Sequence, residues 1–444
     1  MSDANSSSRL ASVLKWTANI ERNELPAVLL SFLFVFVLMT AYSILKPVRD
    51  ALGGDFGNVG LSVAWTANFV LSVIAVSAYG ALLSYVRFRI AVPAVYAFFA
   101  LTFLGLYIAT TQMENPLLIN KGFYVWVSVF SLFHLSVFWA FMADLFDKPQ
   151  AKRLFGLFAA GTSAGALAGP AFTSLLVDAI GAKSLILVSS GLLLVPIPII
   201  LVLERLRTTS LQTEHLHGGV SGQIAIGRNP FAGFSMFLTS RYLLMIGVFI
   251  VLYVTINTFV YFELQHLTGE YGLNTRTKIW AWIEIGTNVL TLLTAVFVTG
   301  RIVLKLGIRT ALAMMPVLVA VGVLVLLASP TLLVLAMFQV LRRVGNYAVT
   351  RPSREMLFTI IGREARFKAK PVIDIVLYRG GDMLTAWMFT LLSTTLGIGL
   401  SGVAIVISGV AALWALVALY LGKAYESDTV DSDTRQSGEL ANGT

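Results

Sequence analysis

Twelve runs of about 20 apolar residues divide this chain of 444 residues and leave little room for a soluble fold. A run of that length is enough to cross the hydrocarbon core of a bilayer as a helix. Only 12% of the residues are charged, against about 25% in soluble domains. The sequence therefore predicts an all-α membrane protein with twelve transmembrane helices. The predicted spans are 26–45, 61–83, 90–110, 123–145, 155–180, 184–203, 242–262, 279–300, 310–328, 331–350, 375–396 and 403–422.

The longest connection, residues 204–241, falls in the middle of the chain and is polar, with several Ser, Thr and Gly residues. It predicts a cytoplasmic linker between two six-helix halves, residues 26–203 and 242–422. Residues 1–25 are predicted to be a cytoplasmic tail, and residues 423–444 a disordered cytoplasmic tail.

Basic residues predict the orientation of the spans. With both termini in the cytoplasm, 23 of the 32 Lys and Arg residues fall in inner segments and 6 in outer ones, while Arg342, Arg343 and Arg379 lie inside spans. Cytoplasmic loops of membrane proteins carry such an excess of positive charge. The net charge of +9 is thus explained by topology and is no argument for a nucleic-acid partner.

The two halves echo each other, as transporter repeats do. The sequence GDFG at 54–57 precedes the second span, and GEYG at 269–272 precedes the eighth. Between the eighth and ninth spans, GRIVLKLGIR at 300–309 resembles the glycine-and-basic loop of the major facilitator superfamily, with Leu304 where that signature has an aspartate. The resemblance implies a major-facilitator-like fold.

Ionisable residues within membrane spans are rare and by default indicate a transport pathway. The segment YSILKPVRDALGG at 42–54 places Lys46, Arg49 and Asp50 at helical spacing at the end of the first span, so that they can share one face. The alternative is that the helix ends here and the two basic side chains extend to the lipid headgroups.

Further charged residues follow in later spans. Arginine offers planar, bidentate donors suited to phosphate or carboxylate, so these groups predict a cationic cavity for an anion, with acidic residues as counter-charges or gates. The candidate substrate-binding residues are Lys46, Arg49, Tyr347, Arg351, Arg354 and Arg379. The candidate counter-charges are Asp50, Asp144, Glu263, Glu284, Glu355 and Asp382. A second group is interpreted as orientation determinants at the inner surface: Arg342, Arg343, Arg363, Arg366, Lys368 and Lys370.

Two backbone features have structural predictions of their own. Pro352 is expected to kink or end its helix. The repeat Gly161, Gly165 and Gly169 forms a face that another helix can approach closely, and packing within the bundle is favoured over dimerisation. The sequence contains no phosphate loop, dinucleotide fingerprint, catalytic triad or metal motif. It therefore predicts neither an enzyme nor a metal or cofactor site.

Several segments resemble the ATP/ADP translocases, the nucleotide transporters of intracellular bacteria and plastids. They are YSILKPVRDAL at 42–52, WAFMADLFDKPQAKRLFGLFAAG at 139–161, NYAVTRPSREM at 346–356 and AKPVIDIVLYRGGD at 369–382. The resemblance implies nucleotide exchange with Arg49, Asp144 and Arg354 at important positions. The chain departs from the pattern at Val260, where the family has an acidic residue and Glu263 follows one turn later, and at Arg351, which replaces another acid.

The leading hypothesis is a monomeric carrier in the inner membrane of a bacterium that exchanges nucleotides or a related phosphorylated anion by alternating access. Its partners would be that anion and the lipid bilayer. A proton-coupled carrier of another organic anion, with Glu284 or Asp382 as the titrating group, is the first alternative. A membrane scaffold or sensor without transport activity is the second.

Overall fold

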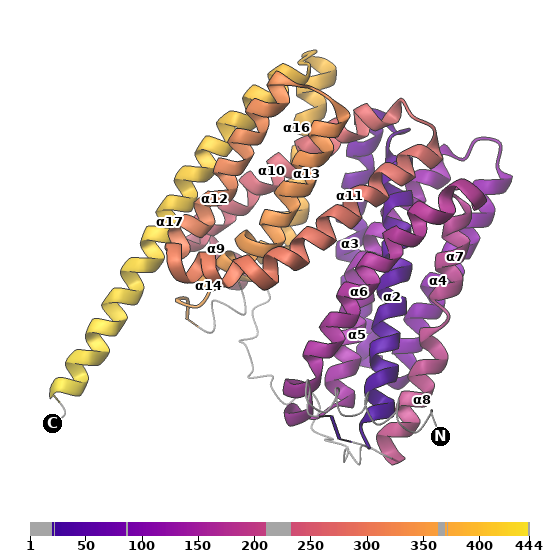
Figure 1. The fold of residues 1–444 in the computed structure, drawn as a ribbon, viewed down its shortest axis with the longest axis horizontal. Helices are drawn as coiled ribbons and strands as arrows, with labels where there is room; N and C mark the ends of the chain where they lie inside the picture. The colour runs from indigo at the N-terminus through magenta and orange to yellow at the C-terminus, as the bar shows by residue number, and fades with distance from the viewer. Residues whose placement is uncertain are drawn as a thin grey trace, which may run out of the picture. The chain divides into compact units, whose positions relative to one another are not determined.

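The computed structural model describes residues 20–21, 23–85, 88–209, 232–362, 369–370 and 372–442, and every element within them is helical (Figure 1). The chain forms two compact units. Unit 1 comprises Met1–Asp55, Val70–Val220 and Tyr271–Ile285. Unit 2 comprises Phe56–Phe69, Ser221–Glu270 and Gly286–Thr444. Each unit thus combines most of one half of the sequence with a short piece of the other.

The first half supplies six spans from seven helices, because α7 and α8 follow each other through one turn. The helices are α2 (Leu25–Gly53), α3 (Gly57–Tyr85), α4 (Phe88–Gln112), α5 (Leu117–Leu145), α6 (Lys148–Ile180), α7 (Ser184–Leu192) and α8 (Pro196–Thr209). Residues 1–19, 22 and 210–231, which include most of the predicted N-terminal tail and linker, lie outside the described residues.

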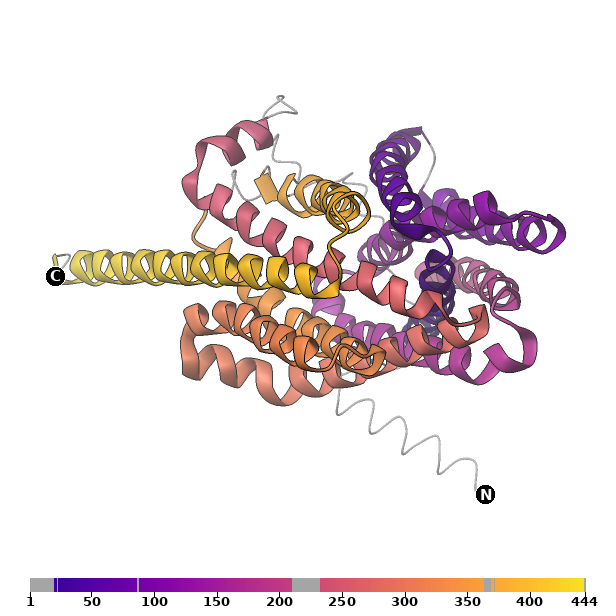
Figure 2. The same cartoon turned by 90° about the horizontal axis from the view of Figure 1, so that it is seen from above.

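The second half is interrupted more often, by four π-helical segments. Its first elements are α9 (Ala232–Thr239), α10 (Arg241–Gly269), α11 (Leu273–Thr294), η1 (Ala295–Thr299) and α12 (Gly300–Ala328). They are followed by α13 (Leu332–Gly345), η2 (Asn346–Thr350), α14 (Arg351–Leu357), η3 (Val372–Leu377), α16 (Tyr378–Thr390), η4 (Leu391–Thr395) and α17 (Leu400–Asn442). Both views show α12 and α17 lying side by side (Figure 1, Figure 2).

Eleven helices in the described part of the chain are long and apolar enough to cross a membrane. The twelfth predicted span, 375–396, is helical as η3, α16 and η4 in succession. The all-α fold of transmembrane helices predicted from the sequence is therefore confirmed. The last helix is longer than predicted, because α17 continues past residue 422 to Asn442 where a disordered tail was expected. Extending a helix that already exists costs far less than starting one.

The glycine repeat of α6 packs against α2 within unit 1, as predicted. A Cβ atom on Gly165 would lie 2.5 Å from the carbonyl oxygen of Phe36 and 2.7 Å from Cβ of Met39. On Gly169 it would lie 2.5 Å from Cβ of Ser43. Small residues allow two membrane helices to approach this closely. The close contact with α6 positions α2, and with it the charged end of the first span.

Two irregular places lie in the second half, one at Gly307 and one before Pro352, the residue that was expected to kink or end its helix. Gly307, in the loop that resembles the superfamily signature, has φ 74° and ψ 167°, a conformation that favours glycine and breaks α12 into two helices. Pro352 follows η2, in which the chain bonds with π-helical spacing before α14 begins. A π-helical turn is a common way to accommodate the hydrogen bond that proline cannot make.

Candidate functional site

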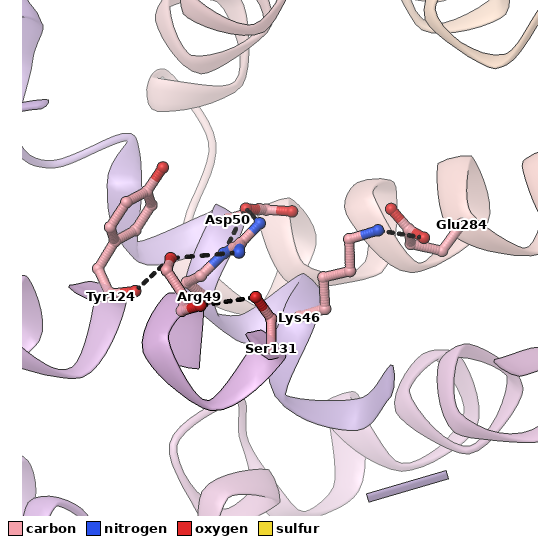
Figure 3. A network of polar contacts seen from close by, with 7 residues as sticks. Lys46, Arg49, Asp50, Tyr124, Ser131 and Glu284 are labelled. Carbon is pink, nitrogen blue, oxygen red and sulfur yellow. Dashed lines mark hydrogen bonds and ion pairs between the residues drawn. The ribbon is translucent and has the colours of Figure 1, made fainter. Parts of the chain in front are cut away.

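The last two turns of α2 place charged side chains inside unit 1. Helix α2 continues through Pro47 to Gly53, so Lys46, Arg49 and Asp50 belong to the helix and do not follow it. Asp50 is 2% exposed, and the Lys46 and Arg49 side chains are 21% and 15% exposed. Figure 3 shows the three residues with the partners that surround them. Asp50 is buried and the two basic side chains are half-buried and bonded within unit 1, so they do not extend to the lipid headgroups as the alternative proposed.

Lys46 pairs with an acidic residue that is 238 positions away in the sequence. Its Nζ donates to Oε2 of Glu284 on α11 at 2.9 Å, and the Glu284 side chain is 5% exposed (Figure 3). Both residues belong to unit 1, because the unit includes the beginning of α11. A pair of buried opposite charges is held by mutual attraction that largely offsets the cost of removing both from water.

Arg49 has partners on α2 and α5. Its Nε and Nη2 donate to Oδ1 of Asp50 at 2.9 and 2.6 Å, and its Nη1 donates to Oγ of Ser128 at 3.4 Å. The guanidinium also lies 5.4 Å from the ring centre of Tyr124, within the range of a cation–π contact. The charge of Arg49 is therefore neutralised by a neighbouring carboxylate.

A second ion pair lies just beyond α2, and the sequence did not predict it. Nη2 of Arg276, which is 5% exposed, donates to Oδ1 of Asp55 at 2.7 Å. A Cβ atom on Gly54 would lie 2.5 Å from Nη1 of Arg276, so the glycine makes room for the guanidinium. The GDFG segment thus has a packing role in addition to marking the repeat.

Arg342 is the most deeply buried charge among the candidate residues of unit 2. It lies on α13, is 0% exposed, and donates from Nη2 to Oε1 of Gln339 at 2.6 Å and to Oδ1 of Asn257 at 2.7 Å. Its guanidinium lies 5.8 Å from the ring centre of Tyr253 on α10. The interpretation of Arg342 as an inner-surface orientation determinant is wrong, because no part of this side chain reaches the surface. Its position inside the predicted span 331–350 was the available signal.

Arg354 belongs to a half-buried network of opposite charges at α14 and η3. Its Nη2 lies 3.3 Å from Oε1 of Glu355 and 3.4 Å from Oδ1 of Asp374. Nζ of Lys370 lies 2.5 Å from Oε2 of the same glutamate. The proposed arginine and its counter-charge are thus brought together, with Lys370 and Asp374 as members that were not on the candidate list.

The remaining candidates of unit 2 form no ion pair within the described residues. Arg379 and Asp382 are three residues apart on α16, yet no ion pair within 4 Å joins them in the described residues, and Oδ1 of Asp382 is buried without a hydrogen bond. Arg351 is exposed. Tyr347 is 40% exposed and lies under the guanidinium of Arg343, 5.8 Å from its ring centre.

The two remaining acidic candidates lie apart from these clusters. Asp144, at the end of α5, accepts a hydrogen bond of 2.7 Å from Arg207 on α8, and it belongs to unit 1 but not to the Lys46 group. Glu263 on α10 is 7% exposed, and none of the ion pairs in the described residues includes it. No group of three or more metal-binding side chains occurs in the part of the chain that the structure describes.

The fold and these buried charges agree with a comparison to known protein families. The family model described as Major Facilitator Superfamily matches residues 25–361, more than half of the chain. The chain belongs to the major facilitator superfamily. It is a multi-pass membrane transporter of small molecules. No curated protein matches this superfamily member at the threshold applied.

Solved transporter structures share the fold of this superfamily member. A POT family transporter in complex with 5-aminolevulinic acid is similar at a TM-score of 0.61 and 12% identity, over 90% of this chain and 96% of that chain. A D-xylose-proton symporter gives a TM-score of 0.59 and 12% identity, over 89% and 97%. An inward-facing, unoccupied bacterial homolog of the human lysosomal transporter Spinster gives 0.56 and 11%, over 92% and 99%. At such identities the similarity shows the fold alone.

Proposed function

We propose that this transporter carries an organic anion by alternating access, and that the anion is a nucleotide or a related phosphorylated metabolite. The observation that carries the proposal is an excess of positive charge in the segment 342–382 of unit 2. Between residues 342 and 382, five basic side chains in the described part are buried or half-buried, and only three acidic ones are. The basic residues are Arg342, Arg343, Arg354, Lys370 and Arg379, and the acidic ones are Glu355, Asp374 and Asp382.

Uncompensated charge in a membrane protein is costly, and proteins keep it where a ligand or ion supplies the opposite charge. Four of these five basic residues are arginines, whose guanidinium groups present paired donors to phosphate or carboxylate oxygens. A substrate with one or two negative charges would restore neutrality. In unit 1 the buried charges are already balanced, because Lys46 pairs with Glu284 and Arg49 with Asp50.

The nucleotide and the exchange mechanism in this proposal are supported by the resemblance to the ATP/ADP translocases. It places Arg49, Asp144 and Arg354 at positions important for exchange, and the buried ion pairs of Arg49 and Arg354 are compatible with such roles. The departures at Val260 and Arg351 leave room for a different phosphorylated anion.

Counterflow into proteoliposomes tests this function. Vesicles that contain the purified transporter are preloaded with ADP, and entry of labelled ATP is measured with other nucleotides, phosphate and organic acids as competitors. The proposal predicts entry that depends on the internal anion and that uncharged adenosine does not inhibit. If no anion enters against any internal counter-substrate, the transport of anions by exchange is excluded.

A proton-coupled carrier is the second candidate, and Asp382 favours it. One of its carboxylate oxygens is buried without a hydrogen-bond partner, as expected for a group that binds and releases a proton. Uptake driven by an imposed pH gradient, without an internal counter-substrate, would support this candidate and argue against exchange.

A membrane scaffold without transport activity is the remaining alternative. It predicts no flux in either assay, and it predicts that Arg49→Ala and Arg379→Ala cause no loss of function.

We also propose that the protein is a monomer in a bacterial inner membrane with both termini in the cytoplasm. The support is the distribution of Lys and Arg over the loops. The glycine face of α6 was the candidate surface for dimerisation, and it is covered by α2 of the same chain.

A further inference from the structure

The hydrogen bonds of Arg342 leave its positive charge without a negative partner. The acceptors of its Nε and Nη2 are the amide oxygens of Gln339 and Asn257, and both are neutral. Its third nitrogen, Nη1, is buried and has no hydrogen-bond partner. No carboxylate lies within 4 Å of the guanidinium in the described residues. A buried guanidinium with a free donor is unusual, because buried charges are normally paired.

The amides of Gln339 and Asn257 are oriented by their bonds to Arg342. Because each oxygen accepts from the guanidinium, each amide nitrogen points elsewhere and keeps two donors. Neither nitrogen donates to another described side chain. The three side chains together therefore present hydrogen-bond donors, and none of them carries a negative charge. Asn257 is half-buried and Gln339 is buried, so Asn257 marks the side from which a ligand would approach.

A comparison with Arg49 shows what is missing around Arg342. Each arginine lies between the first and the fourth span of its half: Arg49 between α2 and α5, and Arg342 between α10 and α13. The guanidinium carbon of Arg49 lies 5.4 Å from the ring centre of Tyr124, and that of Arg342 lies 5.8 Å from the ring centre of Tyr253. In unit 1, however, the carboxylate of Asp50 accepts from the arginine at 2.6 Å, whereas in unit 2 the hydrogen-bond acceptors of Arg342 are the neutral amides of Gln339 and Asn257. An external anion beside Arg342 would supply the negative charge that Asp50 supplies to Arg49.

We propose that Arg342, Gln339 and Asn257 form an oxyanion subsite, which binds one phosphate or carboxylate group of the transported substrate. The inference rests on the proposed function and adds to it the residues that recognise the anionic group. Nη1 of Arg342 and the two amide nitrogens donate to the oxyanion, whose charge replaces the carboxylate that Arg49 has in Asp50. The ring of Tyr253 supports the guanidinium from one side.

A charge introduced at Gln339 tests the subsite while preserving the shape of the side chain. In Gln339→Glu, a carboxylate takes the place of the amide oxygen that now lies 2.6 Å from Nη2 of Arg342. This internal carboxylate would neutralise the guanidinium and repel an incoming anion. The matched control is Gln112→Glu, the same change at the exposed end of α4.

Binding is measured on purified wild type and variants by thermal shift with ADP, inorganic phosphate and succinate, and adenosine serves as the uncharged probe. We expect Gln339→Glu to weaken anion binding about tenfold to hundredfold, the worth of one charge-assisted hydrogen bond, and Gln112→Glu to leave it unchanged. The ADP, phosphate and succinate arms separate a phosphate subsite from a carboxylate one. If Gln339→Glu binds anions like the wild type, the subsite is wrong and the proposed function stands. If the wild type binds no anion, both are wrong.

A second variant separates a binding role from a structural one. Arg342→Gln removes the unneutralised charge, and if the arginine serves a ligand, the ligand-free protein should melt at the same or a higher temperature. The same variant should lose the stabilisation by anions. A clear fall in the melting temperature of the ligand-free variant would show that Arg342 is needed for the fold, and would overturn the subsite.

Discussion

At the scale of single residues, the ion pair of Lys46 and Glu284 could not be predicted from the order of the chain. The two residues are 238 positions apart, and their side chains meet at 2.9 Å because α11 begins within unit 1. If either partner is removed, the other charge is left buried, and a buried unpaired charge is costly.

We predict that Lys46→Ala and Glu284→Ala each destabilise the protein by about 1–3 kcal/mol and that the double variant loses much less than the sum. The measurement is the melting temperature of the four proteins of this cycle in detergent. Strictly additive losses would show that the two side chains contribute independently and that the ion pair has no stabilising effect.

The charged residues illustrate which parts of a site a sequence can predict. The grouping of Lys46, Arg49 and Asp50 followed from helical spacing, because all three lie on consecutive turns of one helix. Arg379 and Asp382 have the same helical spacing on α16, but no ion pair within 4 Å joins them in the described structure. Helical spacing determines the position of each Cβ atom, but it does not determine where the charged end of a long side chain lies. Partners on other helices, such as Gln339 and Asn257 for Arg342, depend on packing that no local pattern contains.

At the scale of elements, the contact between α2 and α6 depends on glycine. We predict that Gly165→Ala destabilises the protein, because its Cβ would lie 2.5 Å from the backbone oxygen of Phe36, which cannot move without displacing α2. Gly156 lies on the same helix with nothing within 4 Å of a Cβ, so Gly156→Ala should be neutral or stabilising by up to about 1 kcal/mol. Melting temperatures of the two variants in detergent give the comparison. An equal effect of both substitutions would contradict the close approach.

The carboxylate of Glu24 links the beginning of α2 to the beginning of α6. Glu24, which is 1% exposed, accepts hydrogen bonds from Arg153 at 2.8 and 3.2 Å and from Gln150 at 3.0 Å. Burial by itself raises the pKa of Glu24. The hydrogen bonds from Arg153, Gln150 and the backbone of Glu21, together with the charge of Arg153, outweigh burial and leave the pKa below its ordinary value of 4.5.

Because the pKa of Glu24 is lowered by folding, its contribution to stability is present above pH 4.5 and is lost as the pH falls through the lowered value. We predict that Glu24→Gln lowers the free energy of unfolding by about 1–3 kcal/mol at neutral pH. The difference from wild type should shrink below pH 4.5. The measurement is the melting temperature of both proteins from pH 7 to pH 3.5. The control is Glu21→Gln, whose side chain is 66% exposed and 3.9 Å from Arg153. A difference that does not change with pH would refute the role of this link.

The elements themselves were predictable where hydrophobicity alone decides them. Ten predicted spans and the pair α7 and α8 follow directly from apolar runs, because a helix is the only way for a single segment to satisfy its backbone in lipid. The segment 375–396 is different, since Arg379 and Asp382 interrupt its apolar character and π-helical turns flank α16. Hydrophobicity sets the length of a helix, but the placement of π-helical turns depends on the neighbours against which it packs.

At the scale of the whole molecule, the orientation in the membrane is predicted by charge alone. The 23 to 6 distribution of Lys and Arg between inner and outer segments places the loop after α4 outside and the end of α8 inside. Both places offer an exposed residue for substitution, Glu114 and Thr209. The chain contains no cysteine, so each variant of the natural sequence carries a single thiol and needs no cysteine-free background.

We predict that Glu114→Cys reacts with a membrane-impermeant maleimide on intact cells, and that Thr209→Cys reacts only after the cells are permeabilised. The reason is that translocating a loop rich in Lys and Arg is disfavoured, so the end of α8 and the linker that follows it stay in the cytoplasm. The unmodified chain, which has no thiol, is the control for background labelling. The reverse pattern would mean that the basic loops face outward. The basic residues of α14, Arg351 and Arg354, lie on the cytoplasmic side by this rule and would then meet the substrate from the opposite face of the membrane.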